Sequence, residues 1–184
     1  MNPNKTYSNE TPVDRPVSPY GVNELKGTQL LIAGLVSSAA MLIFSYLIVT
    51  LGIPAPDYLA QHGTFFNEGL YPEVASGAWW AGFAIYAAIT VLLLPLVYDY
   101  FGSRGILTNR HWLKGTWFGF AIWFLHAAMI APSAGDGFFF RNLASPIFIA
   151  ASSLACWLVY GFGLDVMTRV RAVHHLGIAE KRAA

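Results

Sequence analysis

Charge is the first thing that this chain has little of. Only 11% of its 184 residues are Asp, Glu, Lys or Arg, while 55% are hydrophobic and the mean hydropathy is +0.49. A soluble globular domain usually carries roughly 25% charged residues. The composition therefore excludes an ordinary soluble domain and predicts a membrane protein.

Cysteine and recognisable catalytic motifs are also lacking. Cys156 is the only cysteine, which excludes an intrachain disulfide and a CxxC redox pair. The sequence has no Gly-rich phosphate loop, no nucleophile elbow and no zincin motif. We therefore expect a protein that is not an enzyme, with no catalytic residues, no metal site, no cofactor of its own and no nucleic-acid partner.

The chain does contain four uncharged runs, each long enough to cross a membrane. An α-helix needs about 20 residues to span roughly 30 Å of hydrocarbon. The runs show neither the polar stripe of a soluble bundle nor the strict alternation of an outer-membrane barrel. The predicted fold class is an all-α integral membrane protein with four transmembrane helices. We place the spans at about 28–51, 74–98, 115–134 and 143–164.

The distribution of basic residues predicts the orientation. Of the eleven Lys and Arg residues, only Arg141 falls in an outward loop, and the other ten lie before the first span, between the second and third, or after the fourth. Such a bias places the basic segments in the cytoplasm. We expect a multi-pass protein of the bacterial inner membrane with both termini inside and outward loops at about 52–73 and 135–142.

A partial internal repeat relates the two halves of the chain. Residues 25–43 match residues 113–131 at eight positions, beginning with the shared stretch LKGT. Each half would be a helix pair that starts in the cytoplasm, which predicts two similar parallel hairpins forming a bundle. Chance matches in an alphabet rich in Ala, Leu and Gly are the alternative explanation.

Two polar segments flank the predicted transmembrane domain of residues 27–168. Residues 1–26 are rich in proline and polar side chains and have no apolar run, so they cannot form a core of their own. They are either a solvated tail or a segment ordered on a partner, and we adopt the second interpretation. Residues 169–184 form a basic C-terminal tail.

The first outward loop is too apolar for a free linker. Tyr58, Phe65, Phe66 and Tyr71 give it an aromatic character. Such a segment lies in the membrane interface, packs within its own chain or contacts a neighbouring subunit. We predict these four residues as interaction residues.

His126 is the only ionisable side chain inside a predicted span. Such residues often contact a quinone, a pigment or a shared cofactor, or relay protons. The alternative, which we favour, is a neutral histidine hydrogen-bonded to a neighbouring helix. In the second outward loop, Asp136 and Arg141 could pin the turn or contact a partner. His126 is thus the cofactor-binding candidate, and Asp136 and Arg141 are further interaction candidates.

Residues 111–140, HWLKGTWFGFAIWFLHAAMIAPSAGDGFFF, and the later stretch LVYGFGLD resemble small, mostly uncharacterised bacterial inner-membrane proteins, including the YagU-like proteins. The shared features are a W-x-x-G start to the third helix, a Met/Pro-small-Gly turn after it and a Tyr-Gly step late in the fourth. Some members of this group resemble companions of respiratory haem-copper oxidases. The matching residues here are Trp112, Gly115, Met129, Pro132, Ala134, Gly135, Tyr160 and Gly161.

The leading functional hypothesis is an accessory, non-catalytic subunit that stabilises a bacterial electron-transport complex. The preferred candidate for this complex is a respiratory oxidase, and the second candidate is a photosynthetic or other redox complex. Its partners would be other membrane subunits and lipids, with contact to a haem, quinone or lipid of that complex. One alternative is a freestanding small-solute or ion transporter, and another is a haem- or quinone-binding redox protein.

Overall fold

The computed structural model describes residues 27–104, 106–107 and 111–183, with side chains except at residues 111–112 and 170–183. All regular secondary structure in these ranges is helical. The polar segment predicted at residues 1–26 lies outside them.

In the described part of the chain, four helices are long and apolar enough to cross a membrane, which confirms the all-α fold class with four such helices. The first is α1 (Gly27–Thr50), and the fourth is α7 (Pro146–Ala183), whose apolar part ends at Arg169. The second and third are each built from three consecutive helical segments. These are α3 (Gly77–Ala87), η2 (Ala88–Leu93) and α4 (Leu94–Ser103), and α5 (His111–Leu125), η3 (His126–Ile130) and α6 (Ala131–Ser133).

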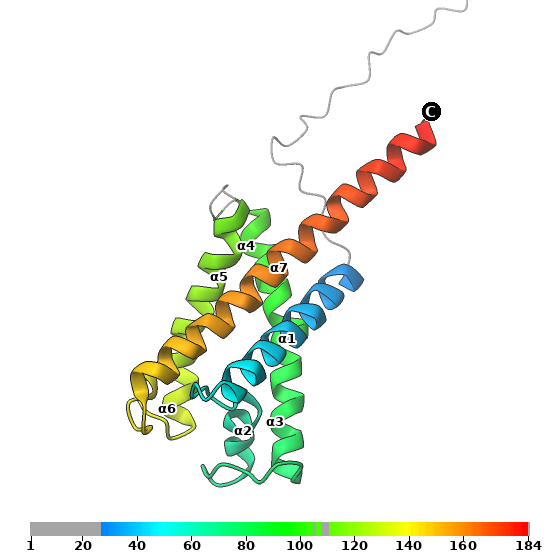
Figure 1. Cartoon of the computed structure of the whole chain (residues 1–184). Coiled ribbons are helices and arrows are strands. Elements are labelled where there is room, and N and C mark those ends of the chain that lie inside the picture. The colour runs from blue at the N-terminus through cyan, green and yellow to red at the C-terminus, as the bar shows by residue number, and fades with distance from the viewer. Residues whose placement is uncertain (1–26, 105, 108–110, 184) are drawn as a thin grey trace, which may run out of the picture.

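The helix α7 lies between α1 and α5 and packs along both (Figure 1). Glycines permit the contact with α5, because a Cβ atom at Gly115 would overlap the carbonyl oxygen of Gly161, and one at Gly119 would overlap that of Trp157. On its other side α1 packs on η2 and α4. There Gly34 approaches Pro95, whose Cγ would lie 2.6 Å from an added Cβ.

The segments η2 and η3 are π-helical, and each is followed closely by a proline, Pro95 or Pro132. Proline has no amide hydrogen, and its ring clashes with the carbonyl four residues earlier. A wider π turn relieves that clash. The second helix therefore continues to Ser103, whereas we expected it to end near residue 98. Opposite η2, the Tyr160 hydroxyl donates to the carbonyl of Thr90 at 2.6 Å.

One end of the molecule is closed by short helical segments, at the bottom of Figure 1. They are α2 (Tyr58–Gly63), η1 (Thr64–Phe66) and η4 (Phe138–Phe140). The Asp57 carboxylate begins α2 by accepting hydrogen bonds from the amides of Leu59 and Ala60. We call this the α2 end. The loop predicted at residues 52–73 thus folds back onto the bundle.

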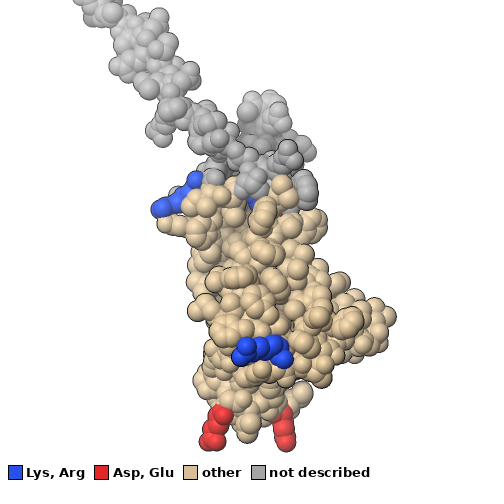
Figure 2. Space-filling model, turned by 90° about the vertical axis from the view of Figure 1, so that its left-hand side faces the viewer, with Lys and Arg blue, Asp and Glu red and all other residues tan. Residues whose placement is uncertain are grey.

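Charged side chains lie toward the ends of the molecule. On the face shown in Figure 2, the part between them carries only neutral residues. The ion pair found among the described side chains joins Arg169 to Asp165 near the end opposite α2. Tyr98 also donates to Asp165, at 2.9 Å. This distribution fits helices whose middle parts contact hydrocarbon.

Candidate functional site

A cavity of about 180 Å³ lies near the α2 end, and we call it the histidine pocket. It is open on one side, where Leu125 and Met129 of the third apolar helix are 51% and 62% exposed. Since that helix is apolar enough to cross a membrane, an opening beside its exposed residues faces lipid if the helix does so. Both π-helical segments contribute to the wall, and such segments frequently occur at functional sites. The lining residues are His62, Tyr86, Ile89, Thr90, Leu94, Ile122, Leu125, His126, Met129, Ile130 and Trp157.

His126 is the first residue of η3 and is only 4% exposed. Neither of its ring nitrogens has a hydrogen-bond partner among the described residues, so the expected bond to a neighbouring helix is not found there. Its ring lies among the rings of Tyr58, Trp157 and Phe140, with centroid distances of 5.4, 5.6 and 6.0 Å. A buried polar group without a partner costs about 1 to 3 kcal/mol, and the His126 ring carries two such atoms on the wall of the pocket.

His62 comes from α2 and faces the same region, with its ring centroid 6.4 Å from that of His126. Its Nδ1 lies 2.6 Å from the carbonyl oxygen of Tyr58. Because a carbonyl only accepts, Nδ1 carries the proton, and Nε2 of the neutral ring is left as an acceptor. Burial lowers the pKa of His62 below its usual value, and the bond to Tyr58 only partly offsets this. The imidazole is therefore neutral near pH 7.

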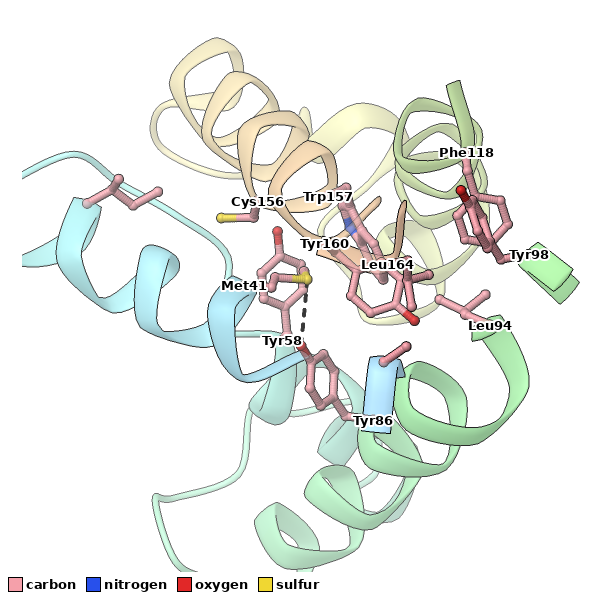
Figure 3. Close-up of a cluster of buried hydrophobic side chains, with 12 residues drawn as sticks. Met41, Tyr58, Tyr86, Leu94, Tyr98, Phe118, Cys156, Trp157, Tyr160 and Leu164 are labelled. Atoms are coloured by element: carbon pink, nitrogen blue, oxygen red, sulfur yellow. Dashed lines mark hydrogen bonds between the residues drawn. The ribbon is translucent and has the colours of Figure 1, made fainter. Parts of the chain in front are cut away.

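Aromatic rings build the inner part of the site (Figure 3). Tyr58 and Trp157 meet edge to face with centroids 5.9 Å apart, and Tyr58 lies 6.3 Å from Tyr86. The Tyr58 hydroxyl donates to Ser153 Oγ at 3.2 Å, and burial raises its pKa well above the usual range. The Tyr86 hydroxyl lies 3.6 Å from the Met41 sulfur. These contacts fix flat side chains around the histidines.

The turn between α6 and α7 is strained where it meets His126. Phe139 and Phe140 both have positive φ, at 51° and 63°. Each such non-glycine residue costs on the order of 1–3 kcal/mol, and such strain clusters at functional sites. Phe140 is nevertheless fully buried against the His126 ring. The strain thus holds an aromatic side chain beside the unpartnered histidine.

Asp136 joins this turn to the first loop. The Gln61 amide donates to one carboxylate oxygen at 2.5 Å, and the Tyr71 hydroxyl lies 2.8 Å from both oxygens. Asp136 is 1% exposed, whereas Arg141 is exposed and does not pair with it. Asp136 thus links this turn to Gln61 and Tyr71 of the first loop, while a contact of Asp136 or Arg141 with a partner stays a prediction. Since Gln61 precedes His62, the contact of Gln61 with Asp136 also positions α2.

The other predicted interaction residues lie in two different environments. Phe65 and Phe66 are 50% and 56% exposed at the α2 end, and Tyr71 is 44% exposed. Tyr58 is instead 2% exposed inside the bundle, beside His126. The structure thus brings Tyr58 and His126 together and leaves the phenylalanines on the surface.

Sequence reasoning missed His62, Tyr86 and Trp157 as members of the site. His62 was treated as a loop residue because α2 has only six residues, too few for a periodic signal. A helix start was nevertheless visible in the stretch PDYLAQHG, where Asp57 is a good N-cap residue. Reading that cap would have placed His62 on a helix.

The chemistry available to the pocket is that of neutral hydrogen-bonding groups. Its lining contains no Asp, Glu, Lys or Arg, and its wall is almost entirely apolar. Within the described residues, no group of three or more His, Cys, Asp or Glu side chains could hold a metal ion. The site can therefore accommodate a neutral, mostly apolar molecule, and the two imidazole rings of His62 and His126 form part of its wall.

Comparison with known proteins assigns the chain to a family. Residues 26–175 match the model of a family of unknown function, DUF6789, so the chain belongs to that family. The predicted kinship with an uncharacterised family is confirmed in this general form. No curated protein and no solved structure matches the chain.

Proposed function

We propose that this protein binds a small lipid-soluble molecule in the histidine pocket, within a membrane. One observation carries the proposal: His126 lines an apolar pocket, is almost fully buried, and has two unpartnered ring nitrogens. No side chain or backbone group of the described residues uses these nitrogens, so they are free to hydrogen-bond a ligand in the pocket. The opening beside Leu125 and Met129 gives a hydrophobic ligand lateral access from the bilayer.

Comparing what two variants retain on purification tests this proposal. His126→Leu keeps a similar side-chain volume and removes both nitrogens. Trp123→Phe is the matched control, because the Trp123 indole nitrogen is also buried and unpartnered, but Trp123 does not line the pocket. Organic extracts of the purified proteins would be compared by mass spectrometry. We expect one molecule to be retained by the wild type and Trp123→Phe and depleted from His126→Leu, whereas identical extracts would refute the proposal.

A second proposal concerns the assembly, and the exposed aromatic side chains at the α2 end favour it. Phe65, Phe66 and Leu70 are 50%, 56% and 67% exposed, and they lie outside the apolar helices. Such side chains are typical of a surface that packs on another membrane subunit or lies in the lipid interface. We propose that the protein is an accessory subunit of an electron-transport complex, as the resemblance to YagU-like proteins and oxidase companions suggests.

Purification in a gentle detergent from the native membrane tests the assembly. The expected result is stoichiometric comigration with redox subunits and their haem or pigment absorption bands. A colourless particle that contains only this chain would contradict it. Replacing Phe65 and Phe66 by Ser should release the partners, while replacing the exposed Leu35 of α1 by Ala should not.

A further inference from the structure

We propose that the ligand of the histidine pocket is a quinone or its quinol, with the ring at the inner wall and the tail in the lipid. This inference rests on the proposed function and names the class of molecule. It is argued from the shape of the wall, from the hydrogen-bonding atoms beside it and from the absence of charge.

The wall of the pocket has two parts of different character. Its inner part consists of the flat side chains of His62, Tyr86, His126 and Trp157. The rest of the wall, including the residues beside the opening, is mostly aliphatic. This second part comprises Ile89, Thr90, Leu94, Ile122, Leu125, Met129 and Ile130. A planar ring packs well against aromatic side chains, and a hydrocarbon tail packs well against aliphatic ones. The wall thus matches an amphiphile with a flat head and an apolar tail.

The polar atoms beside the proposed position of the quinone ring are uncharged. They include both hydrogen-bond donors and hydrogen-bond acceptors. A neutral His126 ring has one N–H donor and one acceptor nitrogen, and neither is partnered. His62 adds an acceptor, because its Nδ1–H is engaged by the Tyr58 carbonyl. Quinone carbonyls accept hydrogen bonds, and quinol hydroxyls both donate and accept them. A charged headgroup finds no counter-ion among the lining residues.

Binding requires a movement of the His126 ring. Its nitrogens are enclosed by neighbouring side chains, while the accessible wall is almost entirely apolar. A half turn about the Cβ–Cγ bond exchanges each nitrogen with a ring carbon, and the two orientations are similar in intrinsic torsional energy. No hydrogen bond holds the present orientation. The ring can therefore turn when a carbonyl or hydroxyl group arrives.

The test uses the purified full-length chain in detergent and measures how far each probe raises the midpoint of thermal unfolding. A ligand that binds only the folded state raises this midpoint, and the rise increases with the logarithm of the ratio of ligand concentration to dissociation constant. The probes are a benzoquinone with a decyl tail, the corresponding quinol, and decylbenzene, which has the same tail and no oxygen. The variants are His126→Leu, His126→Gln, which restores a donor and an acceptor, and the control Trp123→Phe.

We expect saturable stabilisation of the wild type and Trp123→Phe by the quinone or the quinol, and none by decylbenzene. Affinity should fall at least tenfold in His126→Leu and recover in part in His126→Gln. Equal stabilisation by decylbenzene, or equal affinity in His126→Leu and the wild type, would overturn the assignment. If organic extracts show another molecule that depends on His126 while quinones fail to bind, the class is wrong and the pocket function stands. If His126→Leu retains the same molecules as the wild type, both the quinone assignment and the proposed ligand-binding function are refuted.

Discussion

At the scale of single residues, His126 is the side chain that the fold explains least. The same burial that would make a hydrogen bond strong makes a missing one costly. Tyr58, Tyr86 and Tyr160, which are also buried, each have a partner within the chain, namely Ser153, Met41 and the carbonyl of Thr90. The neighbours of His126 are instead ring faces and edges. Because its burial costs free energy, we expect the His126 side chain to hydrogen-bond a molecule outside the chain.

Replacing His126 by Leu should leave the ligand-free protein as stable as the wild type, or more stable by about 1 kcal/mol. The reason is that an apolar side chain of similar volume removes two unsatisfied polar atoms. The measurement is unfolding of delipidated protein in detergent, with Trp123→Phe as the control. A loss of more than about 1 kcal/mol would mean that His126 holds the fold together.

The lowered pKa of His62 leads us to predict that the free energy of unfolding depends on pH. Burial lowers the pKa of His62 in the folded state below its value of about 6.5 in the unfolded chain. The unfolded state therefore binds protons more readily, and the stability contributed by the neutral ring is present above pH 6.5 and lost as the pH falls. Between pH 7.5 and 5, the wild type should lose more stability than His62→Gln. Parallel pH profiles of the two proteins would show that His62 does not titrate differently on folding.

At the scale of elements, α2 depends on a close backbone approach to α3. A Cβ atom at Gly82 would overlap the Leu59 carbonyl oxygen and lie 2.5 Å from the Gly63 amide nitrogen. Gly82→Ala should therefore displace α2, move His62 away from His126 and abolish ligand binding. Gly77→Ala is the control, because no atom lies within 4 Å of a Cβ added there on the same helix. Binding by the Gly82→Ala protein equal to that of the control would show that α2 does not need this contact.

The long helices were predictable from the sequence, and the place of α2 against the bundle was not, for a physical reason. Each long helix must satisfy its backbone within a charge-free run, so composition and length suffice to find it. The position of α2 depends on contacts between residues far apart in the chain, such as Gln61 with Asp136 and Tyr58 with Ser153. A local pattern contains no information on such pairs. His126 could be identified from the sequence, but its companion His62 could not.

Pro95 shows the same limit within a long helix. The span predicted at about 74–98 puts this proline in the last turn of its helix. The structure instead widens η2 before Pro95, and α4 continues to Ser103. The Gly34 position on α1 lies directly against this segment, since a Cβ atom there would be 2.5 Å from the Val91 carbonyl oxygen. Packing between helices, which the sequence does not display, accompanies the widened turn.

At the scale of the whole molecule, each half of the chain contributes a tyrosine whose hydroxyl donates a hydrogen bond to the other half. Tyr98 of the first half donates to Asp165 of the second, and Tyr160 of the second donates to the Thr90 carbonyl of the first. Tyr160 lies 62 residues after Tyr98, and each tyrosine ends a Leu-Val-Tyr stretch. The contacts are consistent with two related hairpins. Duplication itself stays a prediction.

The orientation predicts where a reporter is active. If both termini are cytoplasmic, green fluorescent protein fused after residue 184 should fluoresce in bacteria, because it folds on the cytoplasmic side. Alkaline phosphatase inserted at the exposed turn at Gly69 should be active, since that enzyme needs the oxidising outer compartment. The opposite pair of results would mean that the orientation is inverted, with both termini outside the cytoplasm. The positive-inside bias predicts the first pair.

The central claim, that the histidine pocket holds a lipid-soluble molecule, is tested most directly by photo-crosslinking in the native membrane. A benzophenone amino acid placed at Ile122, on the pocket wall, would be compared with one at Leu35, which is 58% exposed on α1. We predict a single small-molecule adduct from position 122, lost when His126 is replaced by Leu, and a mixture of bulk lipids from position 35. The same lipid mixture from both positions would contradict the claim.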